Sequence, residues 1–328
     1  APRPVQCPSM AAPNPVTTGK SPARPPAEGA DDGRPDSGTM LFEVAWEVCN
    51  QVGGIYQVLR SKAATIVDRW KDRYCVVGPY VEAKASLEFE PSRPTGWIGR
   101  AIAALKEEGL IVHHGRWLIP GAPRALLIEH TLPEKRLGEV KYRLWKDHWI
   151  ESPGSDFWID GAISYGDAVR RLMEKLWHFW GGAGANPKGK PGGADSRRMI
   201  CHAHEWQGGL AVPMLRHSRL PIALVFTTHA TLLGRYIASA EEGFYDRLPR
   251  IDGEAEAARY NVKTQYKMEK ACAHGAHVFT TVSSITGEEC ARLLGRASPP
   301  TGSTSPSTTP RTRCRSGTRN TRSASISS

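Results

Sequence analysis

The stretch that decides the fold begins at residues 40–56, which read MLFEVAWEVCNQVGGIY. Residues 40–46 are mostly apolar and predict a buried strand, and the loop that follows contains the glycine pair Gly53-Gly54. Residues 55–70 show a helical pattern, and residues 74–79, YCVVGP, predict a second strand. A strand, a glycine loop, a helix and a second strand in this order indicate an α/β unit with parallel strands.

The rest of the chain repeats this alternation. Helical patterns separate several short apolar runs that we predict to be strands, at residues 110–113, 125–129, 199–203, 222–228 and 277–282; the clearest helical patterns are at residues 165–180 and 255–276. Short apolar strands that alternate with helices are typical of a parallel sheet covered by helices on both faces. We therefore predict an α/β fold with a Rossmann-like parallel sheet.

Composition divides the chain into three parts. Residues 1–38 are rich in Pro, Ala, Gly and Ser, and we predict a disordered leader because such a segment cannot bury enough apolar surface to offset its chain entropy. Residues 39–296 form the predicted domain, with a surface loop at residues 181–193. Residues 297–328 are almost entirely Ser, Thr, Pro, Arg, Gly and Ala, and we expect a disordered tail.

Charge and cysteine content narrow the class of function. The formal net charge is +10, but five arginines of the tail supply half of it: Arg311, Arg313, Arg315, Arg319 and Arg322. No stripe of basic residues interleaved with aromatic ones is visible, so we do not expect nucleic acid as a partner.

The seven cysteines are scattered, which favours reduced thiols in the cytoplasm. We see no signal peptide and no apolar run long enough to cross a bilayer, so we expect a cytoplasmic protein with no membrane partner.

The glycine pair is the first candidate site. Between a strand and its helix, it would place backbone N–H groups and a helix N-terminus at the carboxyl edge of the sheet, where anions bind. The competing interpretation is a tight turn without a ligand. The segment contains neither the dinucleotide-binding pattern G-x-G-x-x-G nor a P-loop.

Two histidines, His202 and His204, lie at the end of the predicted strand at residues 199–203. Histidines two positions apart on a strand face the same side and could bind a metal, but no third ligand follows at an obvious spacing, and we predict no metal site. A neutral histidine at this place could instead hydrogen-bond a sugar hydroxyl or a leaving phosphate. A histidine satisfied within the core is the remaining alternative.

Two further polar segments follow predicted strands. Residues 226–236, FTTHATLLGRY, put Thr, His and Arg where a buried strand opens into a helix, and Ser283 or Ser284 can cap the helix after residues 277–282. Each segment also has a purely architectural interpretation. Polar clusters at the carboxyl ends of successive strands nevertheless indicate a ligand site, because open α/β sheets bind ligands at that edge.

Together these segments resemble the animal and fungal type of glycogen synthase. The resemblance runs from about residue 40 to residue 296, with poorer matches at residues 81–110 and 130–195. It rests on these runs: Leu41 to Val48, Val52 to Tyr56, Val77 to Tyr80, Gly115 to Ile119, His204 to Trp206, Phe226 to Tyr236 and Val278 to Thr286. The resemblance implies the amino-terminal domain of a GT-B glycosyltransferase, in which two Rossmann-like domains face each other across a cleft.

The resemblance also implies a reaction and the residues that serve it. Glucose would pass from a nucleotide sugar, with UDP-glucose favoured, to the non-reducing end of an α-1,4-glucan such as glycogen, with retention and without a cofactor. His204 matches the family's histidine beside the transferred glucose and is the expected catalytic residue. The loop of the glycine pair would lie against the donor, and the other residues would lie in or near the same cleft. The implied substrate-binding residues are Gln51, Gly53, Gly54, Asp167, Thr228, His229 and Arg235.

Two departures from the family matter. Gln51 stands where the family usually has a basic residue, so its phosphate contact should be weaker. The family's carboxyl-terminal domain, with most nucleotide contacts, does not follow residue 296, so we expect a truncated chain that is inactive alone. Residues 297–305 can be back-translated with G/C-rich codons such that the same bases, read two positions later, give Val-Thr-Pro-Asn-Gly-Leu-Asn-Val, the family's continuation. We therefore hypothesise a frameshift near Arg296, which sequencing of the gene across that codon would test.

Two other functions remain open. One is an ADP-glucose-dependent synthase, because the residues that contact the base lie in the missing half of the family's fold. The other is a non-catalytic glucan-binding module. For the full-length enzyme, the resemblance also leaves room for a homo-oligomer.

Overall fold

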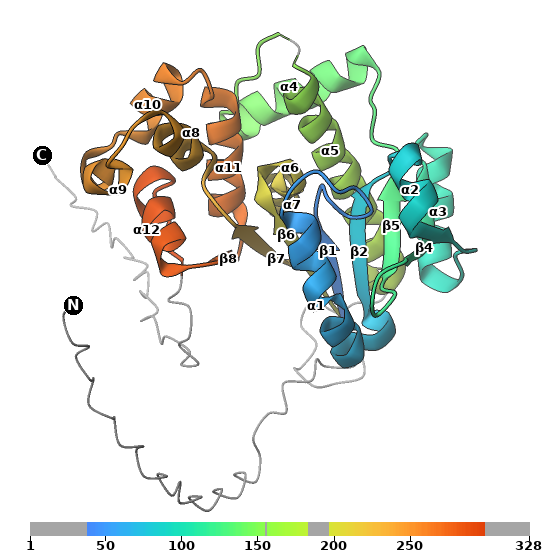
Figure 1. Cartoon of the computed structure of the whole chain (residues 1–328). Coiled ribbons are helices and arrows are strands. Elements are labelled where there is room, and N and C mark those ends of the chain that lie inside the picture. The colour runs from blue at the N-terminus through green and yellow to red at the C-terminus, as the bar shows by residue number, and fades with distance from the viewer. Residues whose placement is uncertain (1–37, 155, 183–196, 299–328) are drawn as a thin grey trace, which may run out of the picture. The chain divides into compact units, whose positions relative to one another are not determined.

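The computed structural model describes residues 38–154, 156–182 and 197–298 (Figure 1). Most of the predicted leader, residues 183–193 of the predicted loop and the tail from residue 299 lie outside the described residues. Among those described, we find no helix whose length and apolar character would allow it to span a bilayer.

An eight-stranded sheet forms the centre of the domain, in the order β3-β4-β5-β2-β1-β6-β7-β8. The strands from β5 to β8 in this order pair in parallel. Their bounds are β1 (Thr39–Val44), β2 (Tyr74–Pro79), β3 (Phe89–Pro91), β4 (Val112–Trp117), β5 (Arg124–Ile128), β6 (Arg198–His204), β7 (Ile222–Thr228) and β8 (Val278–Thr281). The predicted α/β class with a Rossmann-like sheet is confirmed.

One edge of the sheet differs from the prediction. Strand β4 pairs antiparallel with both β3 and β5, so the sheet is mixed. Only residues 118–123 connect β4 to β5, which is too short for the crossover helix that a parallel pair needs. Strand β3 has three residues and no clear apolar run, so no local pattern predicts it.

Helices surround this sheet. Helix α1 spans Ile55–Trp70, as predicted, and α5 begins at Phe157, where Asp156 caps it by accepting hydrogen bonds from two backbone N–H groups. The pattern at residues 255–276 is broken into two helices, because Asn261 adopts a left-handed φ of 56°. The other helices are α2 (Glu82–Glu88), α3 (Gly96–Glu107), α4 (Glu134–His148), α6 (Glu205–Gly209), α7 (Ala211–Ser218), α8 (Leu232–Ala240), α9 (Phe244–Arg247), α10 (Gly253–Arg259), α11 (Lys263–Gly275) and α12 (Ser284–Leu293).

The sheet separates two clusters of buried apolar side chains. Alternate residues of β1 and β2 pack with α3, α5, α7 and α11 in the larger cluster, and the others pack with α1 in the smaller one. This alternation is the expected result of a strand buried on both faces. Helix α1 lies along β1 and β2, as Figure 1 shows. One residue on the α1 face of β1 is charged, namely Glu43, which is only 1% exposed.

The strand order reverses at β1. Strand β2 follows β1 on one side, whereas β6 pairs with β1 on the other side, and β7 and β8 continue away from it. At such a reversal the loops after the strands diverge, which opens a crevice at the carboxyl edge of the sheet. The fold therefore predicts a ligand site beyond the ends of β1 and β6.

Candidate functional site

A pocket of about 430 Å³ lies at this reversal. We call it the carboxyl-edge pocket. Its walls come from the segments after β1, β6 and β7, from the start of α1 and from the start of α5. They are formed by Trp46, Glu47, Val52, Gly53, Gly54, Ile55, Val58, Trp158, His204, Glu205, Trp206, Gln207, His229, Ala230, Leu232, Arg235 and Tyr236. Five of the predicted site residues therefore lie in one pocket, although they come from three separate segments of the chain.

The N-terminus of α1 forms one wall of the pocket. Gly54 is its N-cap residue, and the carboxylate of Glu47 accepts hydrogen bonds from the N–H groups of Gly53 at 2.7 Å and Tyr56 at 3.1 Å. A Cβ on Gly53 would lie 3.1 Å from a Glu47 oxygen, which explains a glycine there. Gln51 is exposed and does not line the pocket. An acidic side chain thus occupies the anion position that the helix N-terminus offers.

His204 lies at the inner end of the pocket and is 2% exposed. Its Nε2 is 2.8 Å from a carboxylate oxygen of Glu43, and its Nδ1 is 3.0 Å from Nε2 of His229. Both ring nitrogens therefore have partners within the protein. The predicted catalytic histidine is in the pocket, but its ring has no nitrogen left for a ligand.

Glu43 lies at the centre of a buried charged cluster. Besides His204, it accepts hydrogen bonds from the Lys62 ammonium of α1 and from the Tyr74 hydroxyl of β2. Burial acts to raise the pKa of Glu43, but the hydrogen bond and charge of His204 and the charge of Lys62 outweigh it and hold the pKa well below its usual range. Glu43 is therefore an ionised carboxylate at neutral pH.

The same cluster has the residue types of a metal site. Ligand atoms of Glu43, His202 and His204 lie within 4.8 Å of one another. However, Lys62 already supplies a cation to the Glu43 oxygen that His204 also contacts, and a metal ion would face that charge. The hydrogen bonds instead make Glu43 the acceptor of an internal network.

The two other histidines of this region are neutral at pH 7. Burial, followed by the charge of His204, lowers the pKa of His202 to about 3, and Nε2 of His202 lies 2.7 Å from the Thr227 hydroxyl. Burial and the charges of His204 and Lys62 lower the pKa of His229 to about 4. Unlike His202, His229 lines the pocket.

The segment after β7 is held by two buried carboxyl groups. Glu205, at the turn from β6 into α6, has a left-handed φ of 55°, and its Oε1 accepts a hydrogen bond from the His229 N–H at 2.7 Å. Glu269 of α11 accepts hydrogen bonds from the Leu232 N–H at 3.0 Å and from the Thr228 hydroxyl at 3.3 Å. Burial, with the charge of Glu205, raises the pKa of Glu269 to about 8. Thr228 therefore lies beneath the pocket and supports it.

Arg235 is the one arginine or lysine among the described residues that line the pocket. Its side chain is 61% exposed, and its guanidinium lies 3.8 Å from the Glu205 carboxylate. An exposed guanidinium beside a loose ion pair can still bind a carboxylate or phosphate bidentately.

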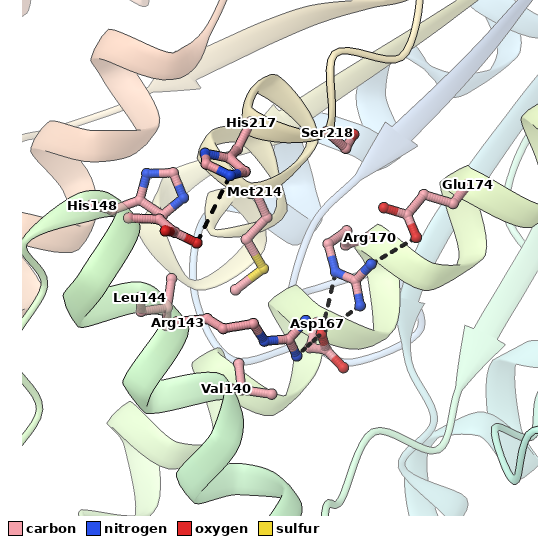
Figure 2. Close-up of a pocket in the computed structure, with 11 residues that line it drawn as sticks. Val140, Arg143, Leu144, His148, Asp167, Arg170, Glu174, Met214, His217 and Ser218 are labelled. Atoms are coloured by element: carbon pink, nitrogen blue, oxygen red, sulfur yellow. Dashed lines mark hydrogen bonds and ion pairs between the residues drawn. The ribbon is translucent and has the colours of Figure 1, made fainter.

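Asp167 lies in a different place from the one predicted for it. It is in α5, on the opposite face of the sheet from α1, and faces α4. Its Oδ1 accepts hydrogen bonds from Arg170 at 2.8 Å and Arg143 at 3.4 Å, as Figure 2 shows. These residues border a second pocket of about 250 Å³, which we call the α5 pocket, between α4, α5 and α7. A role for Asp167 in binding the same ligand stays a prediction.

Sequence reasoning gave no role to Glu43, Glu47, Glu205 or Glu269. One indication was available for Glu43, because an acidic residue within an apolar strand must find a partner when it is buried. The partner itself, His204, is 161 residues away in the chain. The pattern of the sequence does not show which distant side chain it meets.

Comparisons with known proteins identify the family of the chain. A family model described as glycogen synthase matches residues 43–303. The chain is 37% identical over 258 residues to the liver glycogen [starch] synthase of Homo sapiens and 39% identical over 260 residues to the glycogen [starch] synthase of Neurospora crassa. It is 37% identical over 268 residues to glycogen [starch] synthase isoform 2 of Saccharomyces cerevisiae. The chain belongs to the glycogen synthase family.

The alignments cover most of this chain but only part of each relative. Each alignment covers 78% of this chain but only 35% or 36% of the relative. The chain therefore spans about a third of the length of the glycogen synthases that it matches. The predicted resemblance to animal and fungal glycogen synthases is confirmed.

Proposed function

We propose that this chain is the amino-terminal domain, residues 39–296, of a cytoplasmic GT-B glycogen synthase. In this proposal, glucose passes from UDP-glucose to the non-reducing end of an α-1,4-glucan with retention. The observation that carries the proposal is the carboxyl-edge pocket. It combines a helix N-terminus and an exposed arginine with the buried His204 and the half-buried His229 at the reversal of the strand order.

The polar groups of the pocket suit the two ends of a sugar nucleotide. Arg235 and the N-terminus of α1 can attract the diphosphate, and the His204–His229 end can receive sugar hydroxyls. A transition state with oxocarbenium character needs positioned groups and a stabilised leaving diphosphate rather than a cofactor of its own. Gly53, Gly54 and Gln51 would lie along the donor, and Thr228 would support the wall behind it.

A transfer assay tests the proposal against its alternatives. The chain is incubated with glycogen and either radiolabelled UDP-glucose or radiolabelled ADP-glucose, and glycogen co-sedimentation is measured in parallel. Transfer from UDP-glucose supports the proposal, and transfer from ADP-glucose favours the other donor. Co-sedimentation without transfer is the result expected both of a glucan-binding module and of a synthase domain that is inactive alone; transfer by the same domain joined to the carboxyl-terminal domain of a related synthase separates the two. An absence of both would overturn the assignment of a glucan ligand to this chain.

A further inference from the structure

A groove with basic walls lies at the amino edge of the sheet. Helices α7 and α11 each end just before a strand begins, β7 at Ile222 and β8 at Val278, so their C-termini lie at the edge opposite to the carboxyl-edge pocket. Together with the end of α4 they border a groove of about 650 Å³, which we call the amino-edge groove. Proline, alanine and glycine supply part of its lining, and in the described part of the chain no acidic residue lines it. Its basic residues are His148, Arg216, His217, Arg219 and His274.

The two arginines of the groove are not paired with acidic residues. Arg216 and Arg219 are both exposed, and neither side chain makes a hydrogen bond or an ion pair with any residue that the structure describes. Arg170, by contrast, donates a hydrogen bond of 2.8 Å to a carboxylate. The carboxylate of Asp147 approaches the groove only at His217, where it lies 3.9 Å from the ring Nε2. The hydrogen-bonding capacity of both guanidinium groups is therefore free for a ligand.

The charges around Arg216 are also positive. Burial, followed by the charge of Arg216, lowers the pKa of Arg296. Burial, followed by the charges of Arg216 and Arg296, lowers the pKa of His277. These shifts mean that Arg216 faces other basic groups rather than a carboxylate. An anion in the groove would interact favourably with all of them.

Helix C-termini explain only part of this charge. A basic side chain in the last turn interacts favourably with the helix dipole, and α4, α7 and α11 all end at the groove with such residues. The last carbonyls of α11 already have a cation, because Arg296 donates hydrogen bonds to the C=O groups of Ala273 and His274. Arg219 lies beyond the end of α7, with a left-handed φ of 56°. The helix ends therefore leave the charge of Arg219 unexplained.

We propose that the amino-edge groove is a binding site for a phosphate monoester, with Arg216 and Arg219 as the residues that bind the phosphate. A guanidinium group binds phosphate through two parallel hydrogen bonds. Histidines at the ends of α4 and α11 lie on the other walls. Donors from three helix ends suit the tetrahedral phosphate, whose oxygens point in several directions, better than the planar carboxylate. The volume of the groove also leaves room for the group that carries the phosphate.

This site is separate from the carboxyl-edge pocket and goes beyond the proposed function. The two sites lie at opposite edges of the same sheet, so a ligand in the amino-edge groove leaves the donor pocket open. Binding there is measured without transfer or glucan binding. A chain that fails the transfer assay can therefore still confirm this inference, and the reverse also holds.

NMR of the arginine side chains tests the site directly. The Nε–H signals of the chain labelled with ¹⁵N-arginine, assigned with Arg216→Gln and Arg219→Gln, are followed during titration with inorganic phosphate and with phosphoserine. Both signals should shift and saturate with each titrant, and serine or sodium chloride at equal ionic strength should leave them in place. The signal of Arg235 reports phosphate at the carboxyl-edge pocket separately. Equal shifts with chloride, or shifts with inorganic phosphate but not with phosphoserine, would overturn the proposal.

Exposed variants measure the contribution of each arginine. Arg216→Gln should raise the dissociation constant of phosphoserine about fivefold, read from the remaining Arg219 signal, and Arg219→Gln should do the same at Arg216. Both positions are exposed, so the fold should not change. The matched control is Arg93→Gln, which removes an exposed arginine between β3 and α3. An equal loss of affinity in this control would show that only the net charge of the chain attracts the phosphate, and would refute the site.

Discussion

The carboxyl-edge pocket and the α5 pocket are both lined by acidic side chains, arginine and histidine, but they differ in how their arginines are paired. In the α5 pocket Arg170 pairs with Asp167 and Glu174, and the one unbonded oxygen of Asp167 is shut off from solvent. In the carboxyl-edge pocket, Nδ1 of His229 has no hydrogen-bond partner within the part of the chain that the structure describes, and the Arg235 side chain is 61% exposed. The difference teaches that a cluster of charged side chains favours a ligand where its arginine is exposed and makes no hydrogen bond to a carboxylate of the protein, as is the case for Arg235.

The largest expected effect concerns the buried network behind the carboxyl-edge pocket. Glu43→Ala would leave Lys62, Tyr74 and His204 without their acceptor, and we expect a loss of about 3–5 kcal/mol in the free energy of unfolding. Urea unfolding followed by circular dichroism measures it. The matched control is Glu174→Ala beside the α5 pocket, where a 29% exposed partner should cost less than about 1 kcal/mol. Equal losses of unfolding free energy in Glu43→Ala and Glu174→Ala would show that the two pockets do not differ in how much their carboxylates stabilise the fold.

The second effect separates stability from binding. Asp167→Asn would weaken the pairing of Arg170 and Arg143 and should lower the free energy of unfolding by about 2 kcal/mol, without changing glycogen co-sedimentation. His229→Ala should reduce co-sedimentation with a smaller loss of stability, because its ring borders the open pocket. If Asp167→Asn keeps its stability and loses glucan binding, the prediction made for Asp167 is right and the two pockets act together.

A third effect follows from the pH dependence of the support under the carboxyl-edge pocket. Glu269 has a pKa of about 8 in the folded chain, above the ordinary value of 4.5 that applies on unfolding, so folding binds a proton between these values. Stability should therefore fall as pH rises from about 5 to 8, with a contribution of about 1–3 kcal/mol. Glu269→Gln cannot ionise and should flatten this part of the curve, measured as the melting temperature against pH. An unchanged slope would show that Glu269 ionises normally.

The smallest expected effect is a change of donor affinity at Gln51, which lies outside the carboxyl-edge pocket. Gln51→Lys introduces the basic residue that the resemblance leads us to expect at this position. It should tighten donor binding in a complete enzyme by about 1 kcal/mol or less, because the position is exposed. Donor titration by calorimetry at low salt measures the change, and Lys added at an exposed position outside the pocket, Gln57→Lys on α1, serves as a control for added charge. An unchanged donor affinity in Gln51→Lys would remove this residue from the phosphate contacts.

Sequence patterns predicted the fold further than they predicted the site. Strand β2, β7 and helix α1 have the predicted bounds, because apolar runs and helical periodicity are local properties. The polar segments after β1, β6 and β7 meet as expected, because parallel strands end at one edge of a sheet. The position of Asp167 depended on which side of α5 it occupies. The partner of Glu43 depended on the register between β1 and β6. A local sequence pattern shows neither this register nor the side of α5 on which Asp167 lies.

The Glu47 carboxylate has a consequence for turnover. It occupies the N–H groups of Gly53 and Tyr56 that a diphosphate would seek at the start of α1. A ligand that binds these N–H groups must first displace the Glu47 carboxylate, and this lowers the net affinity of the ligand. When the ligand dissociates, the carboxylate can accept the same hydrogen bonds again. In the proposed reaction the product nucleotide keeps the diphosphate, so such an exchange would shorten its residence time as well as that of the donor. The acidic side chain beside the glycine loop would thus favour rapid release over tight capture.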